Sequence, residues 1–200
     1  MQLRRWMVAA LTGAAMVLCG LPAAAQEGVA RQLGQWARAT GDAQGLPFAV
    51  VDKRGARLDV YDADGRLRGS SPALLGQTLG DRSVPGVAQR VLTGLTAAER
   101  TTPAGRFVSE PGRNLRGEAV VWVDYESAFA IHRLRPAPAH ERRAERLASA
   151  TPGDNRITLG CVVVPEAFYD AVVAPVLGRS RAVVYVLPES GEAAGLIRTD

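Results

Sequence analysis

Cys161 is the side chain in this sequence whose chemistry best suits nucleophilic catalysis. It lies in the stretch 156–165, which reads Arg-Ile-Thr-Leu-Gly-Cys-Val-Val-Val-Pro. A thiol attacks as its thiolate, and an ordinary cysteine is only slightly ionised near neutral pH, so a partner base is expected. The chain contains two histidines, His132 and His140, and both are distant from the cysteine along the sequence. Either one can therefore reach the thiol only through the fold.

His132 is the better placed of the two histidines. The run 128–132, Ala-Phe-Ala-Ile-His, has strand character. Side chains alternate across a strand, so His132 shares a face with two small alanines while Phe129 and Ile131 take the other face. His140 lies in a segment rich in Ala, Pro and Arg, which would hold its side chain loosely. We therefore expect His132 to be the base.

Composition alone supports a plainer interpretation of the same cysteine. A cysteine between Gly160 and three valines is more typical of a small buried core residue with an inert thiol. The sequence shows no cluster of Cys, His or acidic residues with metal-ligand spacing and no glycine-rich phosphate loop. We therefore expect neither a metal nor a cofactor.

Residues 1–25 have the pattern of a secretory signal peptide, with two arginines, an apolar run over 6–21 and small residues up to Ala25. The apolar run is short for a membrane-spanning helix. We therefore expect cleavage after Ala25, export to the periplasm or cell envelope, and no integral membrane segment in the mature chain. A retained N-terminal anchor is the alternative. Lipidation at Cys19 is disfavoured because Leu18 stands where a lipobox needs a small residue.

Cleavage would leave a nearly neutral chain with one cysteine. The full sequence has 24 basic and 20 acidic residues, and the signal peptide contains two of the arginines and no acid, which leaves 22 against 20 and a net charge of +2. So small an excess argues against nucleic acid as a partner, because nucleic-acid binding usually needs a clustered basic face. With Cys19 removed, Cys161 has no partner for an internal disulfide.

Strand-like runs dominate the rest of the sequence and predict a mainly β single domain with a few short helices. A helix over 29–40 is expected to end at Gly41-Asp42. Strands are expected at 48–51, 58–61, 73–75, 107–108, 119–123, 128–132 and 183–187. The segment 76–101 is interpreted as a long surface loop with at most one helical turn near 96–100.

The second half of the chain adds one more predicted helix. Residues 133–150 interrupt the strands as a loop or short helix. After the cysteine, Pro165 and Glu166 open a helix. Its apolar face is expected to consist of Phe168, Ala171, Val172 and Val176. Trp122 and Tyr125 are interpreted as core or turn residues.

Four motifs follow one another in a recognisable order. They are Val51-Asp-Lys53 with Leu58-Asp-Val-Tyr61, then Thr102-Pro-Ala-Gly-Arg-Phe107, then Ala130-Ile-His132, then Gly160-Cys161 followed by Val-Val-Val-Pro165. In this order they resemble the L,D-transpeptidase catalytic domain of the YkuD-like type. The resemblance covers roughly residues 47–188, nearly the whole of the predicted mature domain.

The resemblance implies a β-sandwich or barrel-type fold and a catalytic pair. Cys161 would be the nucleophile and His132 the base. The thiolate would attack the third residue of a peptidoglycan stem peptide, expel the terminal D-alanine and leave a thioester, which a second stem's amine or water resolves. Backbone N–H groups of Gly160 and Cys161 would stabilise the tetrahedral oxyanion. No cofactor is implied.

Several polar residues near these motifs are candidates for substrate binding. Arg133 and Arg135 begin an arginine-rich insertion that also contains acidic residues. The insertion fits a solvated, mixed-charge surface helix, and it also fits a clamp for the carboxylates of a stem peptide. Arg156 and Thr158 are weaker candidates for lining the site.

Two residues beside the cysteine depart from the family pattern. Leu159 stands where the family usually has a polar residue or histidine, and Val163 where it usually has Arg or Asn. Alternation along the strand would turn Val163 to the same side as Cys161. A catalytically weak or inactive family member that binds cell wall or a partner protein is therefore the alternative function. A structural exported β domain with an inert thiol is the third.

The sequence thus divides into a signal peptide (1–25), an N-terminal helix and lead-in (26–46), the L,D-transpeptidase-like domain (47–188) and a polar tail (189–200). The tail is expected to be held loosely.

Overall fold

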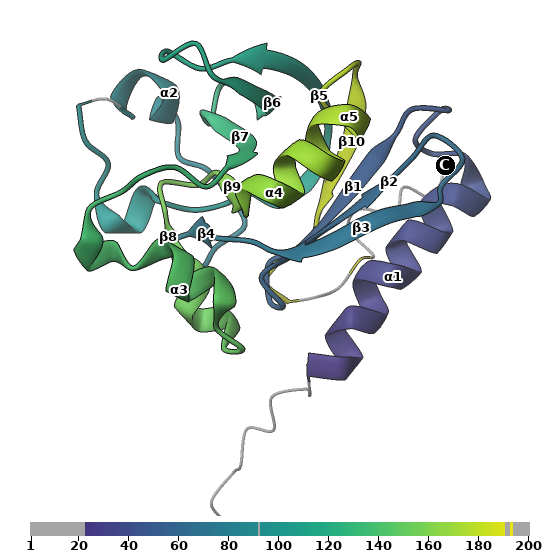
Figure 1. The fold of residues 1–200 in the computed structure, drawn as a ribbon, viewed down its shortest axis with the longest axis horizontal. Helices are drawn as coiled ribbons and strands as arrows, with labels where there is room; N and C mark the ends of the chain where they lie inside the picture. Colours follow the sequence, from purple (N-terminus) through teal and green to yellow (C-terminus); the bar gives the residue numbers. More distant parts are fainter. Residues whose placement is uncertain (1–22, 92, 191–192, 194–200) are drawn as a thin grey trace, which may run out of the picture.

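The computed structural model describes residues 23–91, 93–190 and 193 (Figure 1). Most of the predicted signal peptide and most of the predicted tail lie outside these residues. The strands are β1 (Phe48–Asp52), β2 (Arg57–Tyr61), β3 (Leu67–Pro72), β4 (Leu75–Gly76), β5 (Gly105–Arg113), β6 (Ala119–Asp124), β7 (Phe129–Arg133), β8 (Arg156–Thr158), β9 (Val162–Val164) and β10 (Ala182–Val186). The helical segments are α1 (Ala23–Thr40), α2 (Val87–Arg90), η1 (Ala97–Glu99), η2 (Ala139–Glu141), α3 (Arg143–Ala148), η3 (Pro152–Asn155), α4 (Glu166–Phe168), η4 (Tyr169–Val173) and α5 (Ala174–Val176).

Eight strands form one mixed sheet in the order β3-β2-β1-β10-β5-β6-β7-β9. The pairs β1–β10 and β7–β9 are parallel, and the other neighbours are antiparallel. The sheet nearly closes, because Leu74, which follows β3, exchanges two backbone hydrogen bonds of 2.7 and 2.9 Å with Val163 of β9. The predicted fold class, a mainly β single domain of sandwich or barrel type with a few short helices, is confirmed.

One continuous helical stretch, α4–η4–α5, packs on the interior face of this sheet (Figure 1). Tyr169, Val173 and Leu177 recur every four residues and are fully buried, which is the spacing of one helix face. The predicted helix is confirmed, but Ala171 is exposed, so the prediction of its place on the apolar face is wrong. Residues from both halves of the sheet meet this helix in the main core. They include Ala49, Val51, Leu58, Val60, Val121, Ile131, Val162 and Val184.

The outer face of β1 and β10 is covered by α1. Ala30, Leu33 and Ala37 of the helix are buried against Phe48 and Tyr185 of the sheet. The predicted helix over 29–40 is confirmed, and its last residue is Thr40, as expected. Within the described residues, no helix has the length and apolar character that a membrane span requires.

The outer face of β7 and β9 is covered by a smaller apolar cluster. Leu74, Leu147 of α3 and Val163 are buried together, with Cys161 packed at the edge. The insertion that follows β7 therefore folds back over the strand that carries the cysteine, and its helix α3 forms part of the surroundings of the candidate site.

Some elements differ from the sequence-based expectations. The strand β3 was not expected, because residues 67–72 are polar and Leu67 is exposed, and this strand is held by backbone pairing with β2. The surface-loop interpretation of 76–101 is wrong in part, since α2 forms there and Val87 and Leu95 are buried, whereas η1 forms at the helical turn expected near 96–100. The strand expected at 73–75 is reduced to the bridge described above and the two residues of β4.

The start of the predicted tail is also better held than expected. Glu189 pairs with Arg156 at 3.0 Å and lies 3.4 Å from the ammonium of Lys53. Lys53 is completely buried and also reaches Asp81 at 2.6 Å. These ion pairs hold Glu189 to the body of the domain, because leaving a buried ammonium without its partners would be costly.

Candidate functional site

The pairing of β7 with β9 brings Cys161 and His132 to the same side of the sheet. In this parallel pair, Ile131 lies opposite Val162 and His132 opposite Val163. Cys161, one position before β9, therefore lies beside Ala130. Because side chains alternate, Cys161 and His132 share the outer face, on adjacent strands and two positions apart. Standard strand spacings put their Cα atoms about 8 Å apart. At this separation, the imidazole of His132 and the thiol of Cys161 can approach each other.

His132 is buried, and its ring orientation is fixed by its own strand. Its Nδ1 lies 2.8 Å from the carbonyl oxygen of Arg133, which can only accept, so Nδ1 carries the proton. Nε2 is then the unprotonated nitrogen, as a base requires. Burial, together with the positive charge of Arg135, lowers the pKa of His132 to about 4. The imidazole is therefore neutral at pH 7.

Cys161 is a free thiol in a largely apolar setting. Its Sγ lies 3.5 Å from the carbonyl oxygen of Ala128, and within the described residues it forms no hydrogen bond with His132. Burial raises the pKa of the Cys161 thiol above its ordinary value, although the charges of Arg135 and Arg143 oppose this shift. The resting pair is consequently a neutral thiol and a neutral imidazole.

The backbone at Gly160–Cys161 is held by two threonine hydroxyls. Thr158 Oγ1 accepts from the Gly160 N–H at 3.1 Å and donates to the Cys161 carbonyl at 2.7 Å. Thr102 Oγ1 donates to the Gly160 carbonyl at 2.8 Å. Gly160 has a φ of 140°, and an added Cβ would lie 2.8 Å from the Thr101 carbonyl oxygen, so this position requires glycine.

This arrangement narrows the expected oxyanion donors to one. The Gly160 N–H is already used by Thr158. The Cys161 N–H donates to no acceptor among the described residues. Of the two backbone donors expected from the sequence, the Cys161 N–H is therefore the one free to stabilise an oxyanion.

Among the arginines predicted to bind substrate, Arg135 is the one whose charge acts on both Cys161 and His132. Together with Arg143, it acts on the pKa values of both His132 and Cys161. The same two arginines line a cavity of about 400 Å³ beside Leu134. Arg135 Nε lies 2.8 Å from a Glu118 carboxylate oxygen, but the geometry is too poor for a hydrogen bond. Arg143 is paired with Glu141, and Glu145 and Glu166 also line the cavity, so its lining carries both guanidinium and carboxylate groups.

Two of the other predicted residues, Arg133 and Arg156, lie elsewhere. Arg133 is on the interior side of β7, where it stacks on the Tyr169 ring and pairs with Asp170 at 3.0 Å. Arg156 is occupied by Glu189. Neither guanidinium shares the face of Cys161. Thr158, by contrast, contacts the cysteine directly through its backbone, as described above.

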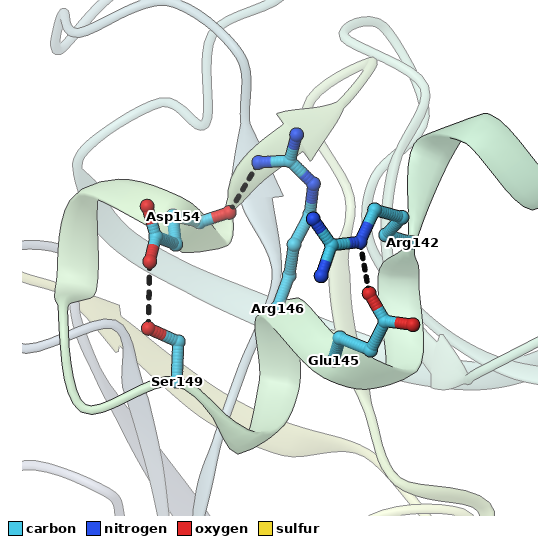
Figure 2. Close-up of a pocket in the computed structure, with 5 residues that line it drawn as sticks. All are labelled: Arg142, Glu145, Arg146, Ser149 and Asp154. Atoms are coloured by element: carbon cyan, nitrogen blue, oxygen red, sulfur yellow. Dashed lines mark hydrogen bonds and ion pairs between the residues drawn. The ribbon is translucent and has the colours of Figure 1, made fainter.

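His140 and the rest of the insertion form a separate region. His140 is an exposed residue of η2. A second cavity, of about 300 Å³, lies on this insertion between α3 and η3. Figure 2 shows that its charged groups satisfy one another: Arg142 pairs with Glu145, Arg146 donates to the carbonyl oxygen of Asp154, and Ser149 donates to the Asp154 carboxylate. Neither Cys161 nor His132 lines this cavity, and neither lines the cavity beside Leu134.

The residues beside Cys161 that depart from the family pattern are in different environments. Val163 is 1% exposed in the cluster with Leu74 and Leu147, on the side expected from strand alternation. Leu159 is 41% exposed. The neighbour of His132 across the sheet is thus an apolar side chain.

Trp122 and Tyr125 are not core residues. Their rings stack on each other with centroids 4.8 Å apart, and Tyr125 is 54% exposed. Trp122 lies opposite Ala130, so it shares the outer face with Cys161. The prediction of turn residues holds for Tyr125, which lies in the turn between β6 and β7.

Sequence reasoning missed Thr102 as part of the site. The signal available was the Thr-Pro turn at 102–103, which was used as a family motif and given no role of its own. No cluster of three His, Cys, Asp or Glu side chains able to hold a metal ion occurs in the described part of the chain. Comparison with models of known protein families and with curated proteins found no match to this chain.

Proposed function

We propose that the chain is an exported cysteine acyltransferase that acts on peptidoglycan stem peptides, by L,D-transpeptidation or by the related L,D-carboxypeptidase reaction. The observation that carries the proposal is the placing of Cys161 and His132 on one face of β7–β9, with Nδ1 of the histidine engaged by the Arg133 carbonyl. A nucleophile and an oriented base on adjacent rigid strands are what acyl transfer requires. The order of sequence motifs supports the same family.

The proposed reaction proceeds through a thioester. His132 Nε2 takes the proton of the Cys161 thiol, and the sulfur attacks the carbonyl carbon of the third stem residue. The carbonyl oxygen becomes an oxyanion, which the Cys161 N–H stabilises. The intermediate collapses, the C–N bond to the terminal D-alanine breaks, and the imidazolium returns its proton to the leaving amine. An amine of a second stem, or water, then attacks the thioester and frees the thiol.

Charge near the pair supports an anionic substrate. Stem peptides carry carboxylates, and the charges of Arg135 and Arg143 act on both Cys161 and His132. The two arginines line one cavity together with Glu145 and Glu166. Guanidinium groups bind carboxylates through paired, charge-assisted hydrogen bonds. We assign substrate recognition to these two arginines rather than to Arg133 and Arg156 because their charges act on both Cys161 and His132. Arg135 is paired with Glu118 and Arg143 with Glu141, so a substrate carboxylate would have to displace these partners.

The direct test is turnover of a purified tetrapeptide stem, followed by mass spectrometry. The expected product is a stem shortened by one D-alanine, or a dimer in which that residue has been exchanged for a second stem. The Cys161→Ala and His132→Ala variants should form neither product. His140→Ala is the matched control and should keep wild-type activity, because His140 is exposed on the insertion. Turnover by Cys161→Ala, or none by the wild type, would count against the proposal.

A second candidate function is favoured by the apolar surroundings of the thiol. Burial raises the pKa of Cys161, and Val163 presents no polar group beside His132. Both features fit a weakly active or inactive member that binds cell wall or a partner protein through the same face. In that case, Cys161→Ala should still pellet with purified sacculi. Failure to pellet would remove this alternative.

A further inference from the structure

Thr102 is completely buried and joins two segments that meet behind the cysteine. Its hydroxyl accepts a hydrogen bond from the Gly76 N–H at 2.9 Å and donates one to the Gly160 carbonyl at 2.8 Å. The direction of both bonds is unambiguous, since an amide N–H can only donate and a carbonyl can only accept. The hydroxyl proton is therefore committed to Gly160.

The backbone of Thr102 is fixed from the opposite side. Its carbonyl oxygen accepts from the ammonium of Lys53 at 3.1 Å. Lys53 is itself buried and pairs with Asp81. Because the backbone of Thr102 is fixed, its hydroxyl cannot shift with the Gly160 carbonyl oxygen that it binds. The position of the Gly160 carbonyl is therefore set by Thr102.

The bond to Gly160 also controls a group on the next residue. The peptide unit is planar and trans, so the Gly160 C=O and the Cys161 N–H lie in one plane and point in opposite directions. Three of the four backbone polar groups of Gly160–Cys161 are bound by the hydroxyls of Thr102 and Thr158. The fourth, the Cys161 N–H, donates to no acceptor within the described chain.

We infer that Thr102 is a positioning residue for acyl transfer at Cys161: through the Gly160 carbonyl, its hydroxyl aims the Cys161 N–H at the oxyanion of the substrate. The inference rests on the proposed function. The bonds that form and break are those of the thioester pathway. Thr102 touches no reacting atom, and it acts by holding the donor in place before charge develops on the carbonyl oxygen.

Two reagents separate this role from simple structural support. A carbapenem reacts with a thiol by attack on its lactam carbonyl, so the carbonyl oxygen becomes an oxyanion before the ring C–N bond breaks. Iodoacetamide alkylates the same sulfur by displacing iodide and forms no oxyanion. A residue that positions the oxyanion donor affects the first reaction and leaves the second unchanged, whereas a residue that only supports the fold affects both.

The test compares the wild type, Thr102→Val and Thr102→Ser. Valine nearly matches the shape of threonine and removes the hydroxyl, and serine keeps it. We expect Thr102→Val to slow the saturating acylation rate constant by about 10- to 100-fold, with the half-saturating concentration little changed, because a misaimed donor acts on the transition state. Iodoacetamide alkylation should stay within about twofold of wild type, and Thr102→Ser should restore acylation.

The results that would contradict the role of Thr102 differ from those that would contradict the proposed function. Equal acylation of Thr102→Val and wild type, or a parallel change in acylation and alkylation, overturns the role of Thr102 and leaves the proposed function standing. An unacylated wild type instead contradicts the proposed function, and the role of Thr102 falls with it. If Thr102→Val does not fold by circular dichroism, Thr102→Ala removes the same hydroxyl with less volume beside Gly76. If the ratio of the acylation rate to the alkylation rate in Thr102→Ala equals that of the wild type, the role of Thr102 is also overturned.

Discussion

His132 and Val163 are register partners across the parallel strands β7 and β9. The candidate base thus lies beside an apolar side chain that belongs to the cluster of Leu74 and Leu147. This neighbour helps to exclude water from the imidazole. The low pKa of the histidine and the raised pKa of Cys161 both have burial as their first cause.

The reactivity of Cys161 should increase with pH. Burial raises its pKa above the ordinary value of 9.0, so the thiolate fraction should grow about tenfold per pH unit up to that range, with no plateau near neutrality. The iodoacetamide rate measured across pH checks this. Arg135→Ala should shift the profile to higher pH, because the guanidinium charge lowers the pKa of the thiol. Arg133→Ala, on the other side of β7, is the control. A plateau below pH 8 would mean that the thiolate is stabilised by a partner.

Acid should destabilise the fold through His132. Its pKa is lowered from 6.5 to about 4, so the unfolded chain binds more protons between these values. Stability from this residue is fully present above pH 6.5 and is lost as the pH falls towards 4, by about 3 kcal/mol in total. Urea unfolding at several pH values measures this change in the free energy of unfolding. His132→Gln should flatten this part of the profile, and His140→Gln should not. A wild-type profile that matches His132→Gln would contradict the assignment.

Lys53→Met should be strongly destabilising. The ammonium is completely buried and is bound by Asp81 and two backbone carbonyls. Its removal takes this donor from the Gly80 and Thr102 carbonyl oxygens. Asp81 loses the cation and, within the described residues, keeps only the hydrogen bond from the Glu189 N–H. We expect this to cost about 3 to 5 kcal/mol in the free energy of unfolding. Arg66→Met breaks an exposed ion pair with Asp64 and is the control, with an expected loss below about 1 kcal/mol. Equal losses in the two variants would refute the structural role of Lys53.

Val163→Asn tests whether the apolar neighbour limits the chemistry. An amide at this position would face the same side as Cys161 and offer a donor near the oxyanion, so we expect faster acylation by a carbapenem. The same change buries an amide among apolar side chains and should cost about 1 to 3 kcal/mol in stability. Val163→Ala, which loosens the cluster without adding a donor, should lose stability without faster acylation. Faster acylation in both variants would mean that the gain comes from easier access of the carbapenem to Cys161 and not from the added amide donor.

The alternation of residues within a single strand was enough to predict which side of that strand each side chain faces. Alternation identified the face of His132, because Phe129 and Ile131 pack in the main core and His132 takes the other side of β7. Ala128, which was expected to share that face, lies in the turn before β7 with a φ of 49°. The same rule placed Val163 on the side of Cys161. The mainly β class followed from the number of short apolar runs.

Contacts between distant segments could not be predicted in this way. The bond from Thr102 to Gly160 spans 58 residues, and that from Lys53 to Thr102 spans 49. Arg133 and Arg135 have the same side-chain type and are two residues apart, yet Arg133 is drawn to Tyr169 of the helical stretch on the interior side. The charge of Arg135, and not that of Arg133, acts on both His132 and Cys161, and residue type does not reveal this difference.

The intact mass of the protein after incubation with a carbapenem tests the central claim most directly. Wild type and Cys161→Ala are compared under native conditions, with iodoacetamide as a second reagent. We predict one covalent adduct of the carbapenem's mass on the wild type and none on Cys161→Ala. A wild-type thiol that resists both reagents in the folded state would contradict catalysis at Cys161.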